Sequence, residues 1–345
     1  MAIEWLAGNR LRGTTAERPN LGLPSGSVGG WVELGRTTWA SGNSINVSSL
    51  PDKRYYMILN YSDSASNYNN IYRFNSDTGS NYAWRRSING GTDSTSTSTT
   101  IIPSNSVSYD DFQFTTSYIA NLAGKEKLVI SHGTDSSAVG AGTAPDRNEI
   151  VGKWVNTTDP IDEITMTTTS ANYNLGEVVV LGWDPADSHT TNFWEELADV
   201  EWSSGGTIDT GSFTAKKYLW VQLYFKGNSG VYTRFNSDSG SNYAWRYNNN
   251  GGTDATQTSI TGITSNFGWG NEPHFINMFI INNSSNEKLV MSHMNFQNTA
   301  GAGNAPSRSE QVHKWANTSS QITSMQLVTG SGNFTGGQIK VWGAD

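Results

Sequence analysis

The chain repeats itself once, and this repeat restricts the fold to two copies of one domain. The segment Arg73–Arg85, RFNSDTGSNYAWR, returns as RFNSDSGSNYAWR at Arg234–Arg246, which is 161 positions later. The segments EKLVISH at Glu126, GAGTAP at Gly140 and KW at Lys153 return at the same spacing, with one or no substitution each. Because each copy is large, the copies are tandem domains and not the small stacked units of a solenoid.

The repeat also sets the domain boundaries. The first 28 residues match nothing in the second half, so they form a separate N-terminal arm. Copy 1 then covers residues 29–185, a short polar linker covers 186–191, and copy 2 covers 192–345. A copy of roughly 150 residues is large enough to bury its own hydrophobic core.

Composition and patterning predict an all-β fold in both copies. The chain is rich in Ser, Thr, Asn and Gly, which form helices poorly, and its 13 Trp and 14 Tyr favour strands. The segment Ile161–Thr169 alternates, which places Ile164, Met166 and Thr168 on one face. Such short runs between turn residues predict two tandem antiparallel β-sandwich domains of jelly-roll type. Other runs that predict strands are Tyr55–Tyr61, Lys127–Ser131, Glu177–Leu181 and Tyr218–Phe225.

The repeated segment predicts a hairpin with one aromatic and one basic face. A turn at Ser76–Ser80 pairs Phe74 with Tyr82, and these aromatic rings are expected to fill the core. Arg73 and Arg85 then share the opposite face, and copy 2 repeats the arrangement. Together with arginines in the two Gly-rich loops, these residues form the candidate binding surface: Arg73, Arg85, Arg147, Arg234, Arg246 and Arg308.

The sequence predicts neither a metal site nor a cofactor. The turn Asn75–Asn81 has oxygen side chains at alternating positions, but Arg86 stands where an EF-hand needs its glutamate. A plain turn is favoured, with a calcium ion as the alternative. His132 and His293 end equivalent Lys-Leu-Val strands without a second ligand at metal spacing, which indicates a structural role.

Several function classes are disfavoured. A net charge of −8 argues against a nucleic-acid partner. No apolar run is long enough for a signal peptide or a membrane span, so synthesis in a cytoplasm without membrane insertion is expected. No Gly-x-Ser-x-Gly motif is present, and the chain is predicted not to be an enzyme. A glycan hydrolase acting through two repeated carboxylates is the alternative.

The repeated motifs resemble segments of proteins from tailed bacteriophages, especially marine ones. The resemblance is carried by the RFNSDxGSNYAxR segment, the NGGTD turn at Asn89, the GAGxAPxRxE loop at Gly140 and the opening residues Gly8–Thr15. It implies a virion structural protein, a capsid decoration or head-fibre component that forms homo-oligomers, commonly trimers. The alternative is a receptor- or glycan-binding module of a tail or fibre that contacts a host surface glycan.

The N-terminal arm is the expected attachment point to other virion proteins of the capsid or tail. It combines arginines with apolar residues, as docking peptides do. The candidate assembly residues are Trp5, Leu6, Arg10, Arg12 and Arg18.

Overall fold

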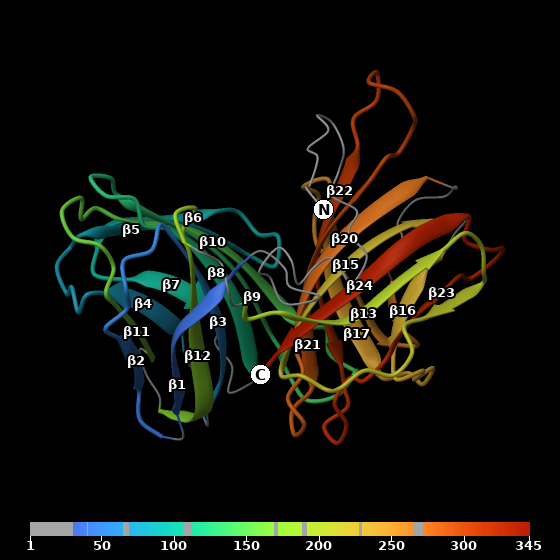
Figure 1. The fold of residues 1–345 in the computed structure, drawn as a ribbon, viewed down its shortest axis with the longest axis horizontal. Helices are drawn as coiled ribbons and strands as arrows, with labels where there is room; N and C mark the ends of the chain where they lie inside the picture. Colours follow the sequence, from blue (N-terminus) through green and yellow to red (C-terminus); the bar gives the residue numbers. More distant parts are fainter. Residues whose placement is uncertain are drawn as a thin grey trace, which may run out of the picture.

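The computed structural model describes residues 30–39, 41–64, 69–105, 112–168, 172–187, 192–227, 230–264 and 272–345. The regular elements in these ranges are 24 strands, and every strand pair is antiparallel (Figure 1). The predicted all-β fold with antiparallel sheets is therefore confirmed. Within the same ranges, no helix is long and apolar enough to cross a membrane.

Copy 1 contains an eight-stranded sheet and a four-stranded sheet. The large sheet has the order β1-β12-β3-β8-β9-β10-β5-β6 and the small sheet has the order β2-β11-β4-β7. The bounds are β1 Val32–Trp39, β2 Ser44–Ser48, β3 Tyr55–Ser64, β4 Asn70–Phe74, β5 Tyr82–Ile88, β6 Ser94–Thr99, β7 Ile102–Asn105, β8 Gln113–Ala120, β9 Lys127–Asp135, β10 Asp146–Trp154, β11 Glu163–Thr168 and β12 Tyr173–Trp183.

Copy 2 repeats this arrangement strand for strand. Its large sheet has the order β13-β24-β15-β20-β21-β22-β17-β18 and its small sheet has the order β14-β23-β16-β19. The bounds are β13 Glu195–Trp202, β14 Thr207–Asp209, β15 Tyr218–Lys226, β16 Tyr232–Phe235, β17 Tyr243–Asn249, β18 Ala255–Ile260, β19 Ile263–Thr264, β20 Pro273–Ile281, β21 Lys288–Phe296, β22 Ser307–Trp315, β23 Met325–Val328 and β24 Gly336–Ala344.

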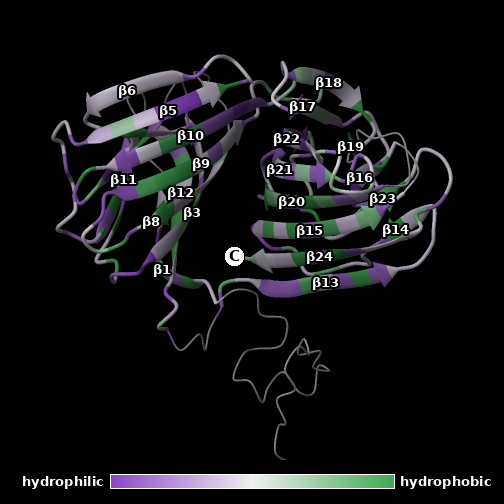
Figure 2. Cartoon of the chain, turned by 90° about the horizontal axis from the view of Figure 1, so that it is seen from above, coloured by the Kyte–Doolittle hydropathy of each residue, from purple (hydrophilic) through white to green (hydrophobic). Residues whose placement is uncertain are grey.

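In each copy the small sheet packs on one face of the large sheet, with an apolar core between them. Ile164 and Met166 of β11 are fully buried there, as the alternation of this segment predicts, and they share the core with Ile58 of β3 and Val178 of β12. Hydrophobic and polar residues alternate along several strands, which Figure 2 shows as bands of colour. The opposite face of each large sheet lies outside this core and takes part in a separate apolar cluster.

The predicted hairpin is wrong, because β4 and β5 belong to different sheets. β4 pairs with β11 and β7, whereas β5 pairs with β10 and β6. Asn75 and Ser76 both have a left-handed φ of 52°, and the chain crosses the core after them. Phe74 and Tyr82 are buried as expected, but they meet across the core, where the Phe74 amide donates to the Tyr82 hydroxyl at 3.0 Å. The shared basic face therefore does not form.

The crossing turn is held by a buried tryptophan. Trp154 Nε1 donates to the Asp77 carboxylate at 2.7 Å, and the Gly79 amide and the Asn81 side chain donate to it as well. Burial alone would raise the pKa of Asp77, but these hydrogen bonds outweigh it and the pKa is lowered. Trp315 and Asp238 repeat the contact in copy 2 at 2.7 Å. The carboxylate that a calcium ion would need is therefore already held by three donors.

Candidate functional site between the two copies

The outer faces of the two large sheets meet, with β9 against β21 and β10 against β22 (Figure 1). Residues of both copies form one apolar cluster there. Tyr218 of copy 2 packs on two rings of copy 1, at centroid distances of 6.4 Å from Tyr61 and 6.3 Å from Phe114. Leu289 and Met291 of β21 are buried in the same cluster. This shared cluster packs the two copies against each other as one unit.

A buried carboxylate ties the copies together near the linker. Glu177 of β12 is 1% exposed and accepts hydrogen bonds from Lys217 Nζ at 3.0 Å and the Tyr218 hydroxyl at 2.8 Å. Arg36 donates to it from copy 1 at 3.2 Å. Burial by itself would raise the pKa of Glu177, but the bonds from Lys217 and Tyr218 lower it. The carboxylate is therefore held ionised between the copies.

A second polar cluster surrounds Arg147. Its buried guanidinium donates to Asp254 of copy 2 at 2.7 Å and to Glu310 at 3.2 Å, and it also pairs with Glu149 of its own copy. Arg246 of copy 2 donates back to the Pro145 carbonyl at 2.9 Å. Of the arginines proposed as a binding surface, Arg147 is therefore enclosed by the contact between the copies, and Arg246 bonds across it.

The remaining arginines of the candidate surface are separated from one another. Arg73 and Arg234 donate to the backbone carbonyls of Thr100 and Thr261, which lie in the connections from β6 to β7 and from β18 to β19. Arg85 of β5 pairs with Asp93 at 3.1 Å, and Arg308 of β22 pairs with Glu310. Both arginines are exposed. The five candidate assembly residues of the arm lie outside the described residues.

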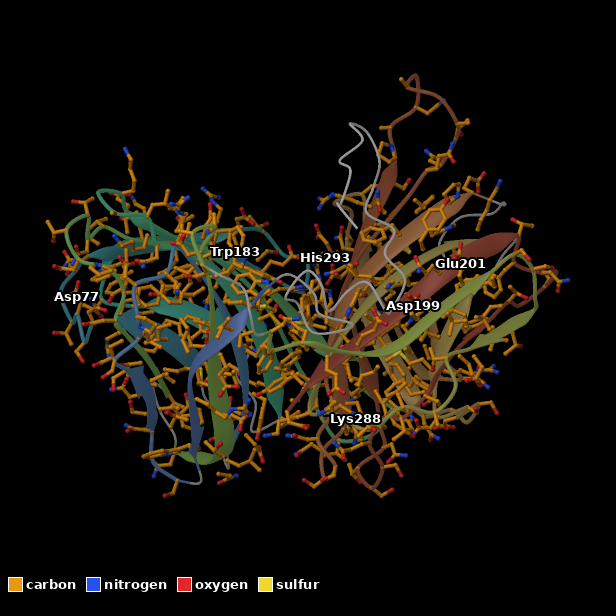
Figure 3. All side chains as sticks on the ribbon, in the orientation of Figure 1. Asp77, Trp183, Asp199, Glu201, Lys288 and His293 are labelled. Atoms are coloured by element: carbon orange, nitrogen blue, oxygen red, sulfur yellow. The ribbon has the colours of Figure 1, made fainter. Side chains whose placement is uncertain are left out.

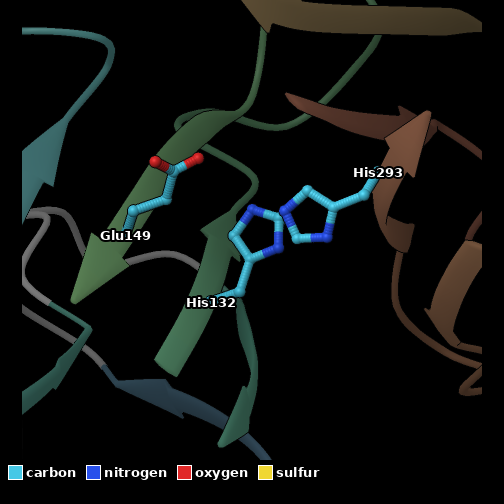
Figure 4. Close-up of side chains that lie close together, drawn as sticks. All are labelled: His132, Glu149 and His293. Carbon is cyan, nitrogen blue, oxygen red and sulfur yellow. The ribbon is translucent and has the colours of Figure 1, made fainter. Parts of the chain in front are cut away.

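The structure brings His132 and His293 together at the centre of this contact. Their rings stack with centroids 4.6 Å apart, and Glu149 lies beside them (Figure 4). The potential ligand atoms of the three side chains all lie within 4.8 Å of one another. The sequence interpretation missed this cluster, because both histidines lie in mid-strand and each finds its partner in the other copy. Their equivalent positions in the repeat were the one available signal.

The cluster has the donor types of a zinc site but not a favourable charge. His132 Nε2 is buried and has no hydrogen-bond partner among the described residues. Burial, with smaller contributions from His293 and Arg147, holds the pKa of His132 well below its ordinary value. Burial also raises the pKa of Glu149 to about 7, although Arg147 opposes this. Two histidines and a carboxylate are suitable zinc ligands. However, Arg147 forms an ion pair with Glu149, and its positive charge repels a metal cation.

A groove of about 310 Å³ opens beside this cluster. Copy 1 lines it with Arg85 of β5, Ile130 of β9 and Val151 of β10, and copy 2 contributes His293 and Glu310. Figure 3 places His293 where the copies meet. The groove combines apolar and charged groups from both copies, so it exists only in the joined unit.

No protein-family model matches the chain, and no curated protein matches it. Among solved structures, the attachment invasion locus protein Ail of Yersinia pestis aligns at 6% identity over 77% of this chain and 99% of that chain, with a TM-score of 0.14. Human GIVD cytosolic phospholipase A2 aligns at 8% identity over 85% and 33%, with a TM-score of 0.14. Scores this low carry no argument about fold or function.

Proposed function

We propose that each copy is a jelly roll. In a jelly roll, eight strands in chain order form two four-stranded sheets, in which the first strand pairs with the eighth and the second with the seventh. The orders β1-β12-β3-β8 and β2-β11-β4-β7 fit this rule when β5-β6 and β9-β10 are set aside as two inserted pairs. The inserted strands extend the first sheet, and copy 2 supports the same reading. The corresponding domains are residues 29–185 and 192–345.

We infer that the chain is a non-enzymatic structural protein of a phage virion, a capsid decoration or head-fibre component attached through its N-terminal arm. The observation that carries this proposal is the contact between the copies. Two of its buried side chains, Glu177 and Arg147, pair with residues of the other copy and hold the two β-domains together as one block. Jelly rolls are common building blocks of virus particles, and the repeated motifs resemble phage proteins. Fold alone does not fix a function, so location is the decisive test.

Immunogold electron microscopy of the virion tests the proposal. Antibody raised against the purified chain should label the head surface, and virions assembled with a chain lacking residues 1–28 should lose the label. Label confined to the tail tip, or no label on intact particles, contradicts a capsid location.

The groove favours a second candidate, a receptor- or glycan-binding module. Exposed Ile130 and Val151 could contact a sugar face, and Arg85 and Glu310 could bind its hydroxyls. A glycan array should then give a signal that Val151→Asp abolishes. An array without binding removes this candidate.

A further inference from the structure

The contact between the copies joins different surfaces of two equivalent sheets, and equivalent residues meet at its centre, where His132 stacks on His293. Copy 1 contributes what we call the tail face: Tyr61, Phe114, the loop 136–141 and Arg147. Copy 2 contributes what we call the head face: Tyr218, Phe279, Leu289, Met291 and Val312, with Glu287, Lys314 and Asp254 at its rim. An interface between different surfaces of equivalent units is heterologous, and it leaves one copy of each surface unused.

The unused head face lies on copy 1 and exposes large apolar side chains. Its residues occupy the same strand positions as the buried head face of copy 2, so the two can be compared one by one. The exposed fractions are 36% against 1% for Tyr55 and Tyr218, 39% against 7% for Tyr118 and Phe279, 55% against 0% for Leu128 and Leu289, 62% against 2% for Ile130 and Met291, and 47% against 0% for Val151 and Val312. Contiguous exposed apolar side chains of this kind mark interaction surfaces.

The unused tail face lies on copy 2 and shows the reverse pattern. Tyr224 is 48% exposed where its equivalent Tyr61 is 7% exposed. Phe275 is 45% exposed where Phe114 is 1% exposed. Within the described residues, the chain therefore presents a largely exposed head face on copy 1 and a largely exposed tail face on copy 2.

The backbone of the unused tail face already has the bound conformation. In the used tail face, the loop 136–141 accepts Lys314 Nζ at the Ser136 carbonyl, 2.8 Å away. Gly140 has φ 92° and its equivalent Gly301 has φ 94°, and Ser137 and Asn298 agree at 59° and 64°. Lys153, the equivalent of Lys314, is half-buried on copy 1 and pairs with Glu126 of its own copy at 2.9 Å. Lys314 is likewise paired with Glu287 while it donates to Ser136, so the pairing of Lys153 with Glu126 leaves the same donor and acceptor loop present on the two outer faces.

The rim groups are also duplicated. Arg147 pairs with Asp254 inside the chain, and their equivalents Arg308 and Asp93 are both exposed. The Ser259 amide donates to the Ala141 carbonyl at 2.7 Å across the used interface. Ser98, the equivalent of Ser259, has the same left-handed φ, 50° against 51°. Arg308 pairs with Glu310 and Asp93 with Arg85, each within its own copy, as Arg147 also pairs with Glu149 while it binds Asp254. Opposite charges and a backbone donor of matching conformation are therefore present on the two unused faces.

We propose that the unused tail face of copy 2 binds the unused head face of copy 1 in a second chain, and so repeats the contact that joins the copies within one chain. Each chain then contacts two others, one through each copy. Head-to-tail contacts of this type close into a ring when the rotation between units divides a full turn, and otherwise extend as a filament. This partner is defined by the surfaces themselves and does not depend on the virion assignment.

Sedimentation velocity of the full chain tests the proposal with two variants. Ile130→Asp places a charge in the unused head face, and Phe275→Asp places one in the unused tail face. Wild type should sediment as an oligomer, and each variant alone should be a folded monomer, with the dissociation constant raised roughly a hundredfold or more. An equimolar mixture of the two variants should form dimers and nothing larger, because one intact head face then meets one intact tail face.

The controls separate this partner from other occupants. Each variant should keep the wild-type circular dichroism spectrum, since both sites are exposed. Its melting temperature should match that of wild type diluted until it dissociates, because association itself stabilises the folded chain. A monomeric wild type overturns the proposal, as does a mixture that stays monomeric. A chain lacking residues 1–28 should associate at least as well as wild type; loss of association in that chain assigns the contact to the arm and overturns the proposal.

Discussion

Leu128 and Leu289 provide a matched pair for testing the contact between the copies. They occupy equivalent positions at the start of β9 and β21, but Leu128 is 55% exposed and Leu289 is fully buried in the cluster that joins the copies. The same substitution to alanine therefore probes the same strand position with and without a neighbour. The main difference between the two sites is that Leu289 belongs to the apolar cluster formed by both copies, whereas Leu128 does not.

Replacement of a fully buried leucine by alanine costs about 2–5 kcal/mol, from lost burial and the cavity left behind. Leu289→Ala should lower the free energy of unfolding within this range. Leu128→Ala removes a side chain that is already more than half exposed, so its cost should be below about 1 kcal/mol.

Urea denaturation followed by tryptophan fluorescence measures both costs, at protein concentrations low enough for the chain to be monomeric. If the two copies do not unfold together, each variant is compared with wild type in the transition of the copy that carries its substitution, copy 1 for Leu128→Ala and copy 2 for Leu289→Ala. Equal costs for the two variants would refute the packed contact between the copies, and a larger cost at Leu128 would refute it as well.

Three further predictions concern buried polar groups. Asp77→Ala and its counterpart Asp238→Ala should each lower the free energy of unfolding in urea by about 1–3 kcal/mol, because the indole N–H of Trp154 or Trp315 loses its acceptor; a neutral result at both sites contradicts the role of the crossing turn. Glu177→Gln should lower the free energy of unfolding by about 1–3 kcal/mol and speed hydrogen exchange of the Tyr218 amide, because Lys217 and Arg36 lose a buried negative partner. Unchanged exchange contradicts the proposed role of Glu177 in joining the copies. Burial lowers the pKa of His313 to about 3, so its neutral form stabilises the fold above the ordinary pKa near 6.5, and this contribution is lost as pH falls below that value. Between about pH 7.5 and 5.5, wild type should lose about 1.4 kcal/mol more than His313→Gln in urea unfolding, and identical pH profiles would contradict the buried neutral histidine.

Local patterns predicted the strands but not their partners. The alternation in Ile161–Thr169 correctly identified the buried face of β11. The turn after Phe74 has the composition of a hairpin, yet the neighbours of β4 are β11 and β7, and those of β5 are β10 and β6. Turn residues alone do not distinguish a return within one sheet from a crossing between two sheets, because distant strands decide it.

The contact between the copies and its histidine cluster could not be predicted from the sequence for a related reason. The repeat makes His132 and His293 equivalent, but equivalence does not place two residues in contact. It also implies equal environments, whereas Leu128 and Leu289 differ completely in exposure. The difference arises because each copy uses a different face toward the other, and a face is composed of residues from many strands.

Cysteine cross-linking tests the repeated contact most directly, since the natural chain has no cysteine. Within one chain, Ala141→Cys with Ser259→Cys joins two residues linked by a backbone hydrogen bond of 2.7 Å and should form an intrachain disulfide, which serves as the positive control. Their unused equivalents are Ala302 and Ser98. Chains carrying only Ala302→Cys, mixed with chains carrying only Ser98→Cys, should form a disulfide-linked heterodimer on mild oxidation. A mixture that yields no more heterodimer than a random pairing of the two single variants contradicts the head-to-tail contact.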